Sequence, residues 1–135
     1  MKLLQLFFLL LCIGLGTSTQ AQTRFKITEM DAYPRLTDIE KAHFAGLEID
    51  AVVHKDNIEL SFVTGQNDKT PYINTYTYRE KINREKIYTE NNHDGHVMVM
   101  ITYKKGLFDR DQITMRQFNP NGEVIGSFVF EEERN

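Results

Sequence analysis

One stretch, from His96 to Lys104, limits what this chain can fold into more than any other. Its sequence is HVMVMITYK, with apolar side chains at consecutive positions as well as alternate ones. Successive side chains of a β-strand point to opposite faces, so such a strand carries apolar groups on both. The stretch therefore predicts a central strand that the shorter, one-faced strands of the chain cover on both sides.

The first residues are expected to be a secretory signal peptide. Lys2 is followed by an apolar run from Leu6 to Leu15 and then by small and polar residues up to Ala21, which is the order of segments in such a leader. We expect cleavage after Ala21, a single mature domain over residues 22–135, and a secreted or periplasmic protein. The run is shorter than the roughly 20 residues that span a bilayer, so no integral membrane segment is expected after processing, and a retained anchor is the alternative.

Cysteine content and charge exclude several classes of function. Cys12, the only cysteine, would leave with the leader, so the mature domain would have no disulfide and would depend on its hydrophobic core. Thiol chemistry and zinc ribbons are excluded for the same reason. Without Lys2, 15 basic side chains face 19 acidic ones, which leaves no basic surplus for nucleic acid.

One short helix is predicted over residues 38–45. Thr37 can cap it while Glu40 returns a bond to the amide of the cap, and Gly46 can take the left-handed conformation that ends it. We expect it to lie on the sheet as a lid or plug. The side chains expected to rest on the sheet are Ile39, Ala42 and Phe44.

Two hairpins have patterns that predict their registers. In the last one, Asn121-Gly122 is the turn, and pairing about it gives one apolar face. In the first, a turn centred on Asp56-Asn57 does the same. The predicted pairs are Met115 with Phe128 and Ile113 with Phe130 in the last hairpin, and Val53 with Leu60 and Ala51 with Phe62 in the first.

The strands are expected to form a mainly β fold, a small antiparallel meander that makes a β-sandwich or barrel of about eight strands. Both architectures use the same alternation, so closure stays open. The charged strand at 82–89 is expected at an edge. The other strands before the last hairpin are expected at 24–31, 47–54, 58–64, 72–79 and 96–104.

No enzyme signature is found, so the protein is expected not to be an enzyme. The chain has no Gly-x-Ser-x-Gly elbow, no phosphate-binding Gly-x-x-x-x-Gly-Lys run and no His-Glu-x-x-His. Asp109 and Asp111 flank Arg110 and could pair for acid/base chemistry. A solvated edge explains them better.

A candidate metal site lies on one face of the central stretch. His96, Met98 and Met100 follow at a spacing of two, with His93 just before them. Imidazole and thioether ligands suit Cu(I), and alternate strand positions lie about 6.6 Å apart, within reach of long methionine side chains. The alternative needs no cofactor, because methionine is also a common core filler.

Tyrosines form a second candidate site. Tyr72, Tyr76 and Tyr78 share one face of a predicted strand, and Tyr103 could join them from an adjoining strand. Rings in a row can stack a sugar or line an apolar pocket with hydroxyls at its rim. The alternative is a core layer whose hydroxyls reach the surface.

These observations predict an exported, non-enzymatic β-domain that binds a small apolar or amphipathic ligand or a protein partner. Two alternatives stay open: an accessory or inhibitor module that binds proteins and no small ligand, and a Cu(I)-binding periplasmic protein. A pocket lined by apolar side chains would favour a small ligand, whereas a filled core with an exposed apolar patch would favour a partner.

Overall fold

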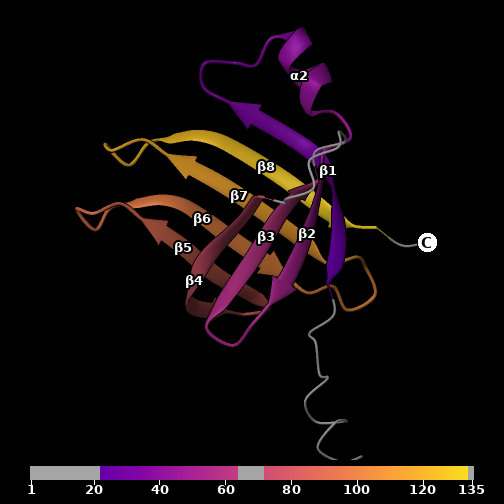
Figure 1. The fold of residues 1–135 in the computed structure, drawn as a ribbon, viewed down its shortest axis with the longest axis vertical. Helices are drawn as coiled ribbons and strands as arrows, with labels where there is room; N and C mark the ends of the chain where they lie inside the picture. The colour runs from indigo at the N-terminus through magenta and orange to yellow at the C-terminus, as the bar shows by residue number, and fades with distance from the viewer. Residues whose placement is uncertain (1–21, 64–71, 134–135) are drawn as a thin grey trace, which may run out of the picture.

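A closed barrel of eight antiparallel strands, with one short helix after the first strand, makes up the fold (Figure 1). The structure is a computed structural model and describes residues 22–63 and 72–133. It confirms the predicted fold class and decides closure in favour of the barrel; the expected leader lies outside the described residues. The elements are β1 (Thr23–Ala32), α2 (Asp38–Phe44), β2 (Glu48–Val53), β3 (Asn57–Val63), β4 (Tyr72–Ile82), β5 (Glu85–Asn91), β6 (Val97–Lys104), β7 (Gln112–Phe118) and β8 (Val124–Glu132).

Strand β1 closes the barrel by pairing with both β2 and β8. Its first residues, from Thr23 to Lys26, lie beside β2, and the longer part from Phe25 to Ala32 lies beside β8. A bulge between Ile27 and Glu29 interrupts the pairing with β8 and bends the strand. The edge predicted for 82–89 is therefore wrong, because β5 is paired on both sides in a sheet that has closed.

The two hairpin registers had different outcomes. The predicted pairs of the last hairpin are confirmed, with Met115 opposite Phe128 and Ile113 opposite Phe130, beyond a shift of the register between Gln117 and Phe118. The first is shifted by two residues from the prediction, with Ala51 opposite Leu60. A shift of two keeps every side chain on its predicted face, so the apolar pattern cannot detect it. The turn has the predicted length but is centred on Lys55-Asp56 instead of Asp56-Asn57, since the amide of His54 donates to the carbonyl of Asn57 at 2.8 Å. The other corrected pairs are Val53 with Ile58 and Ile49 with Phe62.

Large side chains fill the middle of the barrel. Tyr88, Phe25 and Phe130 are the largest of those that are almost wholly buried. They point inward because alternate residues of each strand share a face, and closure turns one face of every strand inward. The remaining buried hydrophobic residues are Ile27, Ile49, Ala51, Ile58, Leu60, Tyr76, Ile101, Ile113 and Met115.

Only one face of β6 is inside. Ile101 is fully buried and pairs with Tyr88 and Met115 of the inner face, whereas Met100 lies on the outer face and is half-buried. A shift of the register at Met98 interrupts the alternation before Val99. The predicted cover on both sides is wrong, because the inner face of a single-layer barrel is the face that packs. In the part of the chain that the structure describes, no second layer lies over β6.

The capping of α2 is confirmed but its predicted contact with the sheet is wrong. Thr37 Oγ1 accepts from the amide of Glu40 at 3.2 Å, the return bond is also 3.2 Å, and Gly46 has a φ of +83°. However, Ile39 is 83% exposed and Ala42 is also exposed. Two turns offer little apolar area, and the helix lies at the rim of the barrel. Only Phe44 packs, edge-on to Phe128 with 6.4 Å between the ring centroids.

The connections lie at two ends of the barrel because the strands alternate in direction. We call the end with residues 33–47, 92–96 and 119–123 the helix end. The opposite end has the turns at 54–56 and 83–84 and the loop at 105–111. Lys55, Arg84, Lys104, Lys105 and Arg110 lie there beside Asp56, Asp109 and Asp111, and we call it the basic end.

Truncating β6 on its two faces should have unequal costs. Ile101→Ala should lower the free energy of unfolding by about 2–5 kcal/mol, because it opens a cavity in a filled core. Met100→Ala, on the outer face, should cost about 1 kcal/mol or less. Urea denaturation measures both. Equal costs would contradict the assignment of faces.

Candidate functional site

A pocket lined by cations lies at the basic end. Its volume is about 540 Å³. It has four cationic side chains in its wall and no carboxylate, and the ion pairs within residues 22–63 and 72–133 involve Arg24, His54 and His93 instead. The residues of the wall are Lys81, Arg84, Lys86, Tyr103, Lys105, Gly106 and Leu107. We call this the lysine pocket.

A bulge in β4 places two lysines opposite each other in this pocket. Tyr78 pairs with Tyr88, and beyond the bulge Lys81 pairs with Lys86. Counting the same strands without the bulge would set Glu80 opposite Lys86, an attractive pair. Like charges directly opposite each other on a sheet are destabilising. The bulge thus replaces a favourable pair with a costly one, and bulges that redirect a side chain are common beside binding sites.

The loop at 105–111 forms one wall of the pocket and is held by Asp111. The carboxylate of Asp111 accepts from the Tyr103 hydroxyl at 2.5 Å and from the amide of Gly106 at 3.0 Å. Its backbone carbonyl accepts from the amide of Glu132 at 2.9 Å. A Cβ on Gly106 would lie 2.2 Å from the carbonyl oxygen of Asp109, so the tight loop requires glycine there. The wall has a defined shape before any ligand arrives.

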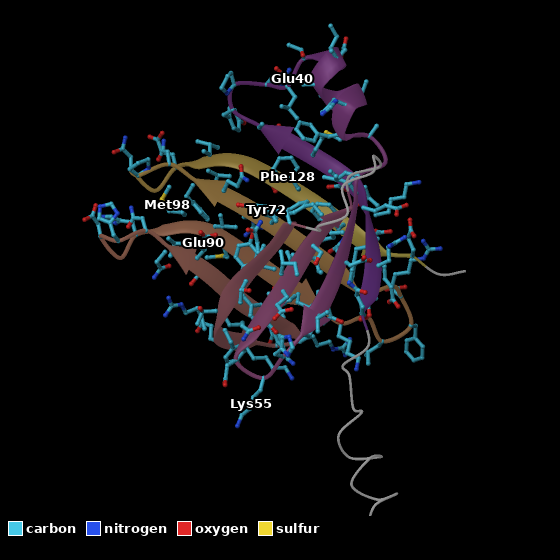
Figure 2. The ribbon with its side chains drawn as sticks, in the orientation of Figure 1. Glu40, Lys55, Tyr72, Glu90, Met98 and Phe128 are labelled. Atoms are coloured by element: carbon cyan, nitrogen blue, oxygen red, sulfur yellow. The ribbon has the colours of Figure 1, made fainter. Side chains whose placement is uncertain are left out.

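The predicted tyrosine site is spread along the inner wall of the barrel. Tyr72, labelled in Figure 2, begins β4 at the helix end and is 72% exposed, whereas Tyr76 is 3% exposed and inside the core. Tyr78 packs edge-on to Tyr88, with ring centroids 5.7 Å apart. Of the four predicted residues, Tyr103 lines the lysine pocket, and the other three lie farther up the wall.

Three of these tyrosines hold their protons more tightly than usual. Burial raises the pKa of Tyr76 to about 12, with a smaller contribution from the charge of Glu90. Burial also raises the pKa of Tyr103, and its hydrogen bond to Asp111 raises it further. Burial raises the pKa of Tyr88 as well, and within the described residues its hydroxyl has no hydrogen-bond partner. Their charged forms are disfavoured inside the barrel.

Stability should therefore fall at alkaline pH. A folded-state pKa above the unfolded value of 10.0 means that the contribution is complete below about pH 10 and is lost as the pH rises through the folded value. We expect the free energy of unfolding to fall between about pH 10 and pH 12, and less steeply in Tyr76→Phe. Urea denaturation across this range measures it. Titration of all tyrosines together near pH 10 in the folded protein would contradict this expectation.

The predicted metal residues lie near the helix end of the barrel, where a shift of the register at Met98 interrupts the alternation of side chains along β6. His96 and Met100 line one groove of about 320 Å³ together with the turn from Asn119 to Gly122. His93 is exposed, with its Nε2 3.7 Å from Asp94 Oδ2. Within the described residues no three or more His, Cys, Asp or Glu side chains form a group suited to a metal. The Cu(I) hypothesis depends on Met98 and Met100 and stays a prediction.

Titration with Cu(I) against a competing chelator tests that hypothesis. If the site exists, binding should be stoichiometric and should disappear in Met98→Leu/Met100→Leu, because leucine keeps the volume and removes the thioether ligands. Unchanged binding in the double variant would exclude this ligand set.

Sequence reasoning did not find the lysine pocket. Its cations come from two connections that lie far apart in the sequence, and the lysine pair depends on a bulge. The Lys and Arg residues at 81–86 and 104–105 were the available signal, although such residues are usually solvated surface.

Comparison with known proteins identified no relative: no protein-family model, curated protein or solved structure matches the chain. Within the described residues, no helix is long and apolar enough to cross a membrane.

Proposed function

We propose that this is an exported, non-enzymatic binding protein whose ligand is a small amphipathic anion, held in the lysine pocket. The observation that carries the proposal is the bulge in β4, which places Lys81 rather than Glu80 opposite Lys86. An arrangement that costs stability without a ligand is explained if an anion lies between the two ammonium groups and neutralises their repulsion.

The chemistry of the wall indicates the kind of ligand. Lys81, Lys86, Lys105 and Arg84 can donate to a carboxylate, phosphate or sulfate group. Tyr103 is half-buried and its hydroxyl is occupied by Asp111, so its ring offers an apolar surface alongside the aliphatic side chain of Leu107. The volume, about 540 Å³, falls within the usual range of roughly 300–1,000 Å³ for small-molecule sites.

A protein partner is the second candidate, and the filled core favours it. The middle of the barrel is occupied by its own side chains, which argues against a ligand deep inside. At the helix end, Tyr33 and Ile39 are exposed, and the amide of Tyr33 donates to the carbonyl of Ile125, another exposed residue, at 3.0 Å. These side chains offer a partner an apolar surface.

Fluorescence titration with anilinonaphthalene sulfonate, an aromatic anion, tests the lysine pocket. We expect saturable binding by the folded protein. Phenylnaphthylamine, which has the same rings without the sulfonate, should bind at least about tenfold more weakly, because the cations supply the binding energy. Lys81→Gln/Lys86→Gln should also weaken sulfonate binding at least about tenfold.

The control is Lys26→Gln/Lys41→Gln, which removes two exposed lysines away from the pocket and should leave binding unchanged. Urea denaturation should show that the pocket variant is as stable as the wild type or more stable by up to about 1 kcal/mol, because a like-charge pair is relieved. Equal binding of the charged and neutral probes would exclude an anion site and favour the partner hypothesis.

A further inference from the structure

Three exposed apolar side chains lie beside the lysine pocket. Phe108 is 94% exposed and Leu107 is 63% exposed, both in the loop between β6 and β7, and Ile82 is exposed at the end of β4. Phe108 is the most exposed of the large hydrophobic residues in the part of the chain that the structure describes. Covering such an exposed aromatic ring with a partner or a lipid surface lowers the free energy.

The exposure of Phe108 belongs to a loop with a defined conformation. Asp111 fixes the loop through Tyr103 and through the amide of Gly106, and Gly106 permits the close approach of the backbone at Asp109. The barrel therefore presents Leu107 and Phe108 outward from a fixed base. A binding surface of this kind does not have to order its loop first, so it avoids that entropic cost.

Positive charge surrounds these apolar side chains. A second hollow of about 700 Å³ adjoins the lysine pocket and shares Arg84 and Lys105 with it, and its wall includes both Leu107 and Phe108. Together the two hollows are lined by six cations and two acids, on a chain whose net charge is −3. The cations are Lys81, Arg84, Lys86, Lys104, Lys105 and Arg110, and the acids are Asp109 and Glu131.

We infer that the basic end docks on an anionic lipid surface. Phe108 and Leu107 enter the headgroup region, and the surrounding Lys and Arg side chains extend to the lipid phosphates. A few apolar side chains combined with basic residues are what interfacial binding requires. A stable protein interface usually needs about 800 Å² on each partner with an apolar centre. The apolar group here is small and ringed by charge, so the lipid surface fits it better.

Co-sedimentation with vesicles tests this inference. The full-length mature protein should bind vesicles of phosphatidylcholine mixed with phosphatidylglycerol and should bind pure phosphatidylcholine much more weakly. High salt should release it, because screening shortens the reach of the charges to about 3 Å at 1 M. Phe108→Ser should weaken binding at least about tenfold, since the buried ring is lost. Lys104→Gln should weaken it about fivefold.

Matched controls lie at the opposite end or on the outer wall. Ile39→Ser removes a similarly exposed apolar side chain from α2 at the helix end, and Lys26→Gln removes an exposed lysine from β1; neither should change vesicle binding. Circular dichroism should show that all four variants are folded. The inference is overturned if the wild type does not bind anionic vesicles, or if Phe108→Ser binds them as tightly as the wild type. Equal binding to soluble polyglutamate would overturn it in favour of an acidic protein partner.

Lipid docking is independent of the proposed small ligand, and the variants separate the two. Phe108 is not part of the lysine pocket, so Phe108→Ser should keep its affinity for anilinonaphthalene sulfonate while it loses the vesicles. If the protein binds the vesicles but not the sulfonate, the lipid-docking inference stands and the proposed function is rejected.

Discussion

The pairing of β1 with β8 is the constraint on which the rest of the structure depends. It joins strands from opposite ends of the domain and removes both edges of the sheet, which would otherwise be open to pairing with other chains. Closure also gives each strand one inner face and one outer face. The packing of Phe25, Tyr88 and Phe130 at the centre follows from it, and so does the position of Met100 on the outside.

Local signals in the sequence predicted local structure well. The predicted pairs of the last hairpin are observed, although of Asn121-Gly122 only Gly122 has a positive φ, and a shift of the register between Gln117 and Phe118 separates the turn from those pairs. Thr37, Glu40 and Gly46 marked the ends of α2 correctly. The first hairpin has no equally strong turn dipeptide, and its register was predicted two residues away from the one observed, on the correct face.

Features that depend on closure could not be predicted in the same way. The apolar pattern of residues 96–104 indicates that a strand is apolar on both faces but does not say whether a second layer covers it. The lysine pocket depends on a single bulge in β4, and the pairing of Lys81 with Lys86 appears only when the register on both sides of that bulge is known. The tyrosine pattern correctly grouped residues on the inner face. However, these residues are spread along the length of the barrel, with Tyr76 in the core between exposed Tyr72 at one end and Tyr103 near the other.

The double pairing of β1 also has a consequence for the order of folding. β1 leaves the ribosome before any other strand of the barrel, yet β8, its partner along most of its length, is made last. Until then one side of β1 remains unpaired, and a neighbouring copy of the chain could offer its own β8 in place of the one still to come. The connection at 33–47 would be the natural hinge for such an exchange. The pairing of β1 with β8 that completes the monomer is thus also the pairing through which two nascent chains could form a domain-swapped dimer.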